Sequence, residues 1–216
     1  MNKKKAWQTW YTSDPHFGHI DKNKSGVISF CNRPFKDMED MLNKIRVKWN
    51  KKVSPEDQVI FVGDIFLYWS KKQAREYLDS LNGRKILVRG NHDKKPRDMN
   101  AMGFDFVCEQ MDVLIGNERV TVSHFPFRIP LHRHLWLKIK KKVYNLFGFR
   151  GPWVDKYYKR RPKDTGQFLI HGHTHSDVKT KGRMIHVGMD ARNFEPVPFQ
   201  QIGNEISEIR RKEGSE

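Results

Sequence analysis

The chain has 216 residues, 37% of them hydrophobic and 31% charged, and a formal net charge of +16. This length fits one compact domain, residues 1–216, and the composition excludes a disordered chain. No stretch approaches the roughly 20 apolar residues that span a bilayer, and the lysine-rich start at 1–5 precedes no apolar signal-peptide core, so we expect a cytoplasmic protein without a transmembrane segment.

The first third of the chain alternates strands and a helix. Residues 6–12 are rich in aromatic and β-forming side chains and predict a strand that delivers Asp14 to a loop. A short apolar run at 59–62 predicts a second strand, which ends at Gly63-Asp64. Between them, Asp37 can cap a helix whose apolar positions follow helical spacing: Met38, Met41, Leu42, Ile45 and Trp49.

The same alternation continues further along the chain. Ser70 can cap a helix that carries Ala74, Tyr77, Leu78 and Leu81, and Gly83 is placed to end it. A short strand at 85–88 then runs into Gly90-Asn91-His92-Asp93. The segments 113–115 and 120–122 flank Gly116-Asn117 and predict a hairpin, and 168–170 and 184–187 predict later strands.

Polar clusters follow several of these strands. Loops beyond the strand ends of an α/β sheet can aim side chains from distant positions into one cleft. The clusters supply carboxylate, imidazole and amide donors, which suit borderline divalent metals such as Mn, Fe or Zn. They are Asp14-Pro-His16, Gly63-Asp64, Asn91-His92-Asp93, Ser123-His124 and His171-Gly-His173-Thr-His175.

Two cations held about 3.5–4 Å apart repel each other, so an anionic carboxylate must bridge and offset that repulsion. Asp64 is the natural bridge. Taken singly, Asp14, Asp64 and Asn91 could be helix caps or turn residues, and a lone His124 could be structural. Their occurrence together with the other histidines favours a metal site.

The five blocks, D-x-H, G-D, G-N-H-D, an isolated H and G-H-x-H, resemble the calcineurin-like metallophosphoesterase superfamily, complete and in order from Asp14 to His175. Three further segments resemble a small single-domain branch found in bacteria and phages: Ser13-Asp14-Pro15-His16-Phe17-Gly18-His19, Phe30-Cys31-Asn32-Arg33-Pro34-Phe35 and Arg160-Arg161-Pro162. The resemblance implies an α/β (α+β) fold, a four-layer sandwich of two mixed β-sheets flanked by helices.

The resemblance also implies two divalent metal ions, Mn first, with Fe, Zn or Ni as alternatives. The same resemblance implies that one metal is bound by Asp14, His16 and His175. It implies that the other metal is bound by Asn91, His124 and His173, and that Asp64 bridges the two. His92 then resembles the catalytic histidine beside the leaving-group oxygen, with Asp93 orienting its ring. A metal-bridging hydroxide would be the nucleophile.

Other candidate residues have two interpretations. Arg33, Arg160 and Arg161 could clamp a substrate phosphate or lie in surface loops. His19, His171 and His186 are left out of the ligand set, because the family pattern gives them no direct metal contact. Cys31 and Cys108 have no metal-ligand spacing and are interpreted as packing residues in a reducing compartment.

Residues 131–161 look like a basic, aromatic-rich insertion, with ten Lys or Arg, seven aromatics and a single acid, Asp155. Leu135, Ile139, Val143, Leu146 and Phe147 fall on one helical face, while Lys138, Lys140, Lys141 and Lys142 lie elsewhere. The segment could close over the site as a lid that contacts a nucleotide, bind nucleic acid through phosphates and bases, or lie on an anionic membrane.

The sequence therefore predicts a metal-dependent phosphoesterase whose substrate is a phosphate ester, with the positive charge favouring a phosphodiester of a nucleotide or nucleic acid. Two alternatives stay open. One is a nucleic-acid-binding protein on the same fold, for which a missing ligand or a missing His92 would be the sign. The other is a phosphomonoesterase or protein phosphatase. The sequence leaves the oligomeric state undetermined.

Overall fold

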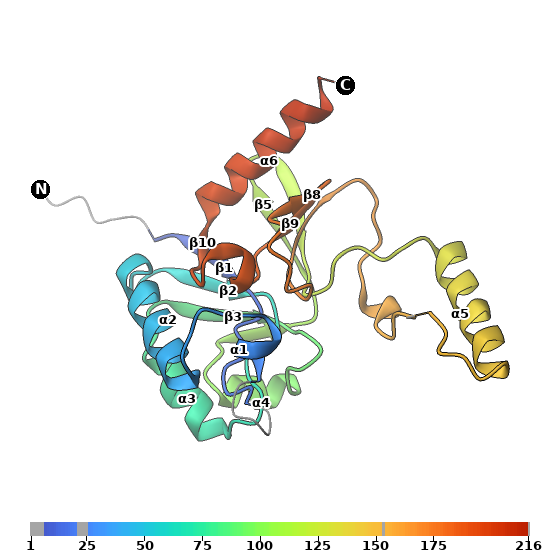
Figure 1. Cartoon of the computed structure of the whole chain (residues 1–216). Coiled ribbons are helices and arrows are strands. Elements are labelled where there is room, and N and C mark those ends of the chain that lie inside the picture. The colour runs from blue at the N-terminus through green and yellow to red at the C-terminus, as the bar shows by residue number, and fades with distance from the viewer. Residues whose placement is uncertain (1–6, 21–25, 153, 216) are drawn as a thin grey trace, which may run out of the picture.

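The computed structural model describes residues 7–20, 26–152 and 154–215, and in these ranges the chain forms two five-stranded sheets packed face to face (Figure 1). The first sheet has the order β10-β1-β2-β3-β4, in which β1 to β4 are parallel and β10 is antiparallel. Its strands are β1 (Thr9–Thr12), β2 (Gln58–Phe61), β3 (Arg84–Val88), β4 (Phe106–Cys108) and β10 (Val197–Pro198).

The second sheet has the order β5-β6-β7-β9-β8 and is also mixed. Strands β6, β7 and β9 are parallel to one another, and β5 and β8 are antiparallel edge strands. The strands are β5 (Met111–Ile115), β6 (Glu118–Val122), β7 (Phe168–His171), β8 (Thr180–Lys181) and β9 (Met184–His186). The expected pair of mixed sheets flanked by helices is confirmed.

Two apolar clusters hold these layers together. One lies between the first sheet and the helices α2 (Met38–Lys52), α3 (Lys71–Asp79) and α4 (Pro96–Ala101), with Trp49, Phe61 and Leu87 fully buried. The other lies between the sheets, where Val62 and Ile170 are fully buried, and α6 (Phe199–Glu213) adds Ile202 and Ile206 to it. Alternate residues of each strand therefore serve different cores.

Local sequence signals account for the helices of the first layer. Asp37 accepts a hydrogen bond from the backbone N–H of Asp40 at 2.9 Å and caps α2. Ser70 forms a capping box with Gln73 at the start of α3. Helix α3 ends at Asp79 with Ser80 as its C-cap, so the predicted extension to Leu81 is wrong, although Leu81 is buried in the same core.

Most predicted strands are confirmed with small shifts in their ends. The first begins at Thr9, and Ala6, which the prediction included, lies outside the described residues. The hairpin around Gly116-Asn117 is confirmed, because β5 and β6 pair antiparallel with Ile115 opposite Glu118. The sequence analysis missed β4, β8, β10, the short helices α1 (Val27–Phe30) and α4, and the whole of α6.

Parallel pairing brings the carboxyl ends of β1, β2 and β3 to one edge of the first sheet, and those of β6, β7 and β9 to the facing edge of the second. An isolated bridge between Ser13 and Gly188 joins the two edges, and the backbone N–H of Met189 donates to the carbonyl of Ser13 at 3.0 Å. The loops after these strands therefore face one another.

Helix α5 (Leu131–Leu146) stands away from the sheets (Figure 1). The chain leaves the body after β6, forms α5 and returns through the 3-10 helix Tyr158–Arg160. We call residues 127–161 the arm. The predicted helix is confirmed, but its apolar side chains do not pack on the body. Within the described ranges no helix is long and apolar enough to cross a membrane.

Candidate metal centre

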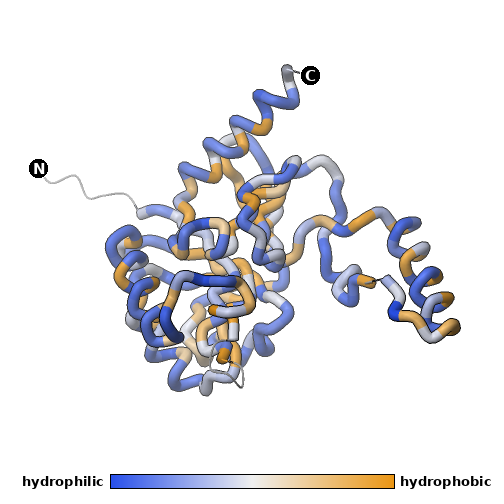
Figure 2. Tube along the Cα trace, in the orientation of Figure 1, coloured by the Kyte–Doolittle hydropathy of each residue, from blue (hydrophilic) through white to orange (hydrophobic). Residues whose placement is uncertain are grey.

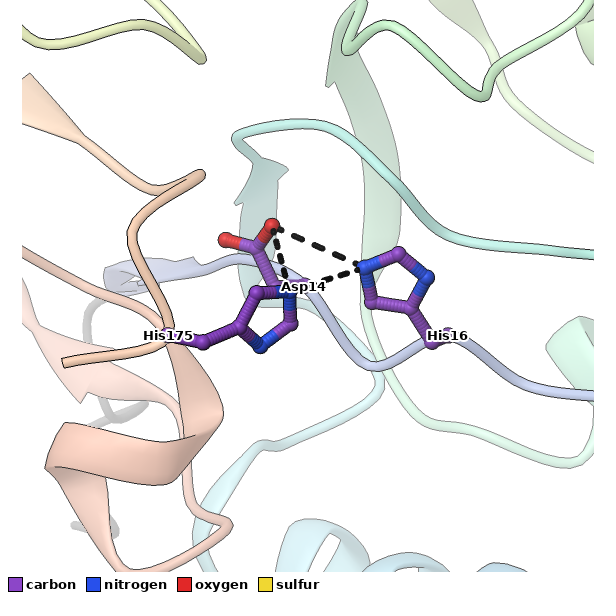
Figure 3. A group of neighbouring side chains, drawn as sticks. All are labelled: Asp14, His16 and His175. Atoms are coloured by element: carbon purple, nitrogen blue, oxygen red, sulfur yellow. Dashed lines mark hydrogen bonds and ion pairs between the residues drawn. The ribbon is translucent and has the colours of Figure 1, made fainter. Parts of the chain in front are cut away.

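Asp14, His16 and His175 come together from the loops after β1 and β7 (Figure 3). The Nε2 atoms of His16 and His175 lie 3.2 Å apart, and each lies 3.8 Å from Oδ1 of Asp14. All three donor atoms therefore lie around one point. His16 is buried, whereas His175 is partly exposed.

A second group contains Asp64, His124 and His173, from the loops after β2, β6 and β7. Nε2 of His124 lies 3.3 Å from Oδ2 of Asp64 and 3.2 Å from both Nδ1 of His173 and Oδ1 of Asn91. The same Oδ2 of Asp64 is 3.9 Å from Nε2 of His16 in the first group. Asp64 thus lies between the groups, and the structure brings all seven predicted ligands together.

Five of these seven residues have left-handed backbone conformations: Asp14 (φ 57°), His16 (φ 52°), Asp64 (φ 57°), His173 (φ 70°) and His175 (φ 49°). A residue with a Cβ in this region costs about 1 kcal/mol or more relative to the right-handed region. Such strain persists only where the surrounding structure enforces it, and it is concentrated at functional sites. Here it turns the side chains sharply out of the strand direction and toward one another.

Two glycines permit the close packing of these loops. A Cβ on Gly90 would lie 2.1 Å from Oδ1 of Asp64, and one on Gly172 would lie 1.9 Å from Oγ of Ser13. The φ of Gly172 is not positive, so this glycine is needed for space and not for its backbone conformation: its absent side chain makes room for the loop that carries Asp14.

Hydrogen bonds behind the site fix which ring nitrogens face it. Nδ1 of His124 lies 2.9 Å from the carbonyl of Val62, which leaves its Nε2 facing Asp64. Nδ1 of His175 lies 2.9 Å from Oδ2 of Asp190, which leaves its Nε2 facing Asp14. Carbonyl and carboxylate partners of this kind orient metal-binding histidines and raise their basicity.

Asp190 is a functional residue that the sequence analysis missed. It lies in the 3-10 helix Met189–Arg192, shortly after β9, and its carboxylate binds both His175 and Arg33. The available signal was its position after a predicted strand, like the other polar clusters. Nδ1 of His175 also lies 3.2 Å from Sγ of Cys31, so this cysteine touches the site as well as the core.

Arg33 is not presented to a substrate. Its side chain is fully buried, and its guanidinium donates to Asp190 and to the backbone carbonyls of Asp14 and Pro15, both at 2.8 Å. The predicted phosphate contact at Arg33 is therefore corrected: the residue holds the loop that carries Asp14 and His16. Arg161 is similarly engaged with the buried Asp155 and the carbonyl of Pro126.

His92 lies at the exposed side of the centre, as expected for a group that meets a substrate. Its side chain is 47% exposed, and its Nε2 lies 3.9 Å from Oδ2 of Asp64. Asp93 does not orient that ring. Its buried carboxylate accepts hydrogen bonds from the backbone N–H groups of Asp64, Ile65 and Gly90, so it fixes the loops around the bridge.

The electrostatics of the centre suit a cation. Burial lowers the pKa of His16 to about 2 and that of His173 to about 4, which keeps both rings neutral with a lone pair available. Burial opposes protonation of His124, yet the charge of Asp14 and the hydrogen bond with Asp64 raise its pKa to about 9. The carboxylates therefore stabilise positive charge at this place.

The hydrogen bonding of the candidate donor atoms also fits a bound metal ion. Oδ1 of Asp14 is buried and has no hydrogen-bond partner among the described residues. An orphaned carboxylate oxygen is costly in a protein interior, and a cation that it binds removes the cost. Mixed imidazole, carboxylate and amide donors suit Mn, Fe or Zn better than Ca.

A pocket of about 290 Å³ opens in front of the centre. His92 and the exposed ring of Phe30 line it, together with His16, His19, Val27, Asp64, Asn91, His173 and His175. His171 and His186 do not line it and stack on each other 5.1 Å apart. The family pattern leaves these two histidines out of the ligand set, and neither of them lines the pocket.

The base of the arm borders the same centre. The ring of Tyr157 lies 6.0 Å from that of His173, perpendicular to it. Arg160 donates to the carbonyl of Gly90 at 3.2 Å and stacks over Phe125, with 35% of its side chain exposed. Arg160 also forms an ion pair with Glu109 at 3.0 Å, and of the three predicted phosphate-binding arginines it is the most exposed at the edge of the site.

Comparison with known proteins gives a consistent picture. A family model described as calcineurin-like phosphoesterase matches residues 8–177. An uncharacterised protein, MJ1445, of Methanocaldococcus jannaschii is 41% identical over 201 residues, which cover 88% of this chain and 86% of that protein. The gene 66 protein of Mycobacterium phage L5 is 29% identical, covering 95% of this chain and 97% of its own.

Among solved structures, a protein of unknown function, AQ665, from Aquifex aeolicus has a similar fold. The TM-score is 0.61 at 23% sequence identity, and the match covers 93% of this chain and 100% of that protein. At this identity the likeness concerns the fold alone.

Proposed function

The chain belongs to the calcineurin-like phosphoesterase family, and from this premise we propose that it hydrolyses a phosphodiester of a nucleotide or nucleic acid at a pair of divalent metal ions. One observation carries the proposal. Oδ2 of Asp64 lies 3.9 Å from Nε2 of His16 and 3.3 Å from Nε2 of His124, between two sets of donors. A carboxylate in that position can offset the repulsion of two cations.

The proposed division of ligands follows the two donor groups. Asp14, His16 and His175 would hold one ion, and Asn91, His124 and His173 the other, with Asp64 shared. When bound, the metals would polarise the phosphoryl oxygens and lower the pKa of a water molecule. Manganese is the first choice because the carboxylate and amide oxygens of Asp14, Asp64 and Asn91 suit it, while the imidazole donors also admit Fe, Zn or Ni.

His92 is the proposed proton donor to the leaving-group oxygen. It has the exposure to reach a substrate, and its backbone N–H donates to Oδ1 of Asp64 at 2.8 Å, which ties its position to that of the bridge. Asp93 supports it indirectly, because it fixes the backbone on both sides of the bridge. Arg160 is the proposed contact for a substrate phosphate oxygen beside the Gly90 loop.

The preference for nucleotides is supported by the pocket mouth and the overall charge. Phe30 lines the pocket and is 77% exposed, and Tyr68 is similarly exposed, with its ring 6.0 Å from that of His19. Exposed rings at a site of this kind can stack on a base. The net charge of +16 favours the approach of polyanions. The unpaired Cys31 and Cys108 suit a reducing cytoplasm.

The test is a substrate screen of the manganese-loaded protein against nucleotide diesters, cyclic nucleotides, nucleic acids, phosphomonoesters and an aliphatic diester such as glycerophosphoethanolamine. We expect nucleotide diesters to be preferred. Phe30→Ala should raise KM for them by about tenfold, the value of one stacking contact, and leave the aliphatic diester unchanged.

Phe106→Ala removes another exposed phenylalanine, on β4, and serves as the matched control. If no phosphate ester is hydrolysed with any divalent metal, the proposed activity is wrong. If monoesters are preferred and Phe30→Ala has no effect, the nucleotide diester is the wrong substrate.

A further inference from the structure

Helix α5 carries an apolar stripe of which the described chain leaves about half or more exposed. Leu135, Ile139 and Val143 recur every fourth residue and so lie along one face, with Leu146 continuing it. Their exposed fractions are 48%, 62%, 48% and 81%. The aromatic rings of Trp136, Phe147 and Phe149 are exposed as well, and the hydrophobic residues of the arm are visible in Figure 2.

Positive charge borders the stripe on both sides. Lys138 and Lys142 are four residues apart and follow one edge, while Arg133 and Lys140 are seven apart and follow the other. The Nζ atom of Lys140 lies 4.8 Å from the ring centre of Trp136. The whole helix contains no acidic residue.

The face of α5 next to the stripe makes the contact with the rest of the arm. His134 is buried, and its ring stacks on that of Tyr158 with 3.8 Å between centres. Lys141 lies against Gly151, where a Cβ would come within 2.8 Å of the helix backbone. These contacts hold the helix by the face beside the stripe, and Leu135 and Ile139 line a hollow that also includes Tyr158 of the returning segment. The stripe stays open to solvent and is not folded down on the body as a lid.

We propose that α5 docks on an anionic lipid surface, with the stripe in the acyl-headgroup boundary and the flanking cations on the lipid phosphates. Its 16 residues are too few to cross a bilayer but suit a helix that lies in the interface plane. Exposed Trp, Tyr and Phe beside Lys and Arg are the side chains that favour this boundary.

Two other possible partners of the stripe, nucleic acid and a second copy of the chain, fit less well. Nucleic acid would use the lysines and the aromatic rings but leave the aliphatic side chains Leu135, Ile139 and Leu146 in water. A second copy of the chain would bring ten positive charges and one negative charge of residues 131–161 against an identical set. An anionic bilayer satisfies the apolar and the cationic groups together.

Docking would also place the metal centre near the lipid surface, because the arm is tied to it at its base. Tyr158 contacts His134 of α5, and its neighbour Tyr157 faces His173. Arg160 reaches the carbonyl of Gly90, beside Asn91. The inference itself does not require the proposed activity, since it concerns the arm alone.

Vesicle flotation of the full chain tests the proposal, with pure phosphatidylcholine vesicles compared with vesicles that contain about a third phosphatidylserine. Binding should require the anionic lipid and weaken as salt rises. Changing Lys138, Lys140, Lys141 and Lys142 to glutamine should weaken it by on the order of a hundredfold or more. Leu135→Gln, Ile139→Gln and Leu146→Gln together should weaken it by more than about tenfold, because glutamine keeps the helix and removes the stripe.

Two matched controls make the outcome specific. Lys51, Lys72, Lys181 and Lys212 are exposed lysines of the body, and their change to glutamine removes the same charge. Val47→Gln, Phe106→Gln and Leu114→Gln remove exposed apolar groups of the body. Both controls should bind vesicles like the parent chain.

The proposal is overturned if the parent chain does not float with anionic vesicles, or if the body variants lose binding as much as the α5 variants. It is also overturned if the parent chain sediments as a dimer that the stripe variant dissociates, because a second copy would then cover α5. Binding of RNA or DNA that needs the four lysines, without vesicle binding, would assign the surface to nucleic acid.

Discussion

In the metal centre, charged and polar groups are buried, and five of the candidate ligands have left-handed backbone conformations. Hydrogen bonds join the neighbouring loops, but Oδ1 of Asp14 and Nδ1 of His16 have no partner among the described residues. In the arm, aliphatic and aromatic side chains are exposed, and Tyr157 and Arg160 at its base contact the body. Each of these two arrangements costs free energy in the isolated chain. The difference fits the partner proposed for each region: divalent cations for the converging donors of the first, and an anionic lipid surface for the second.

The two regions should respond to metal in opposite ways. Removing divalent ions with a chelator should lower activity by at least about a hundredfold, and Mn should restore it far better than Ca. Vesicle binding through α5 should not change, since no donor of the centre lies on that helix. Full turnover in excess chelator after long dialysis would show that the centre does not need a metal.

Within the centre, the bridge and the proton donor can be separated. Asp64→Asn should lose both metals and activity, because the two cations are then under-compensated. His92→Asn should keep the metals and lose turnover by about 10²- to 10⁴-fold. Elemental analysis beside kinetics distinguishes these outcomes. Two metals per chain and the parental rate in Asp64→Asn would disprove the bridge.

Replacing Asp190 should lower metal affinity less than replacing a ligand does, but more than replacing a surface carboxylate does. Asp190→Asn removes the charge that orients His175, and we expect metal affinity to fall about 10- to 100-fold. Titration of Mn into metal-free protein by calorimetry measures it. Asp177→Asn, an exposed carboxylate two residues after His175, is the control. Equal affinities in the two variants would mean that Asp190 serves only the packing around Arg33.

The smallest effect concerns the stability of the arm. Ile139→Ala should change the free energy of unfolding by less than about 0.5 kcal/mol, because its side chain is already exposed to water. Leu87→Ala, in the core behind the centre, should cost about 2–5 kcal/mol. Urea denaturation compares them. A large loss in Ile139→Ala would show that α5 packs on the body in solution.

Some residues of the centre could be predicted from the sequence and others could not. The seven candidate ligands stand in short blocks directly after strands, so their sequence pattern was sufficient to find them. Arg33, Asp93 and Asp190 were assigned differently or missed. Their roles depend on partners far away in the chain: Arg33 and Asp190, for example, are separated by 157 in residue number, and no local pattern encodes such a contact.

The sequence by itself determined the family, the order of the strands and helices around the site, the ligand blocks and the amphipathic pattern of α5. These features depend on residue type and on spacing along the chain. Only the tertiary structure decided that the guanidinium of Arg33 points inward, that Asp93 binds backbone rather than His92, and that the stripe of α5 is left uncovered. Burial and hydrogen-bond partners are properties of how distant segments pack, and the same local sequence is compatible with several of them.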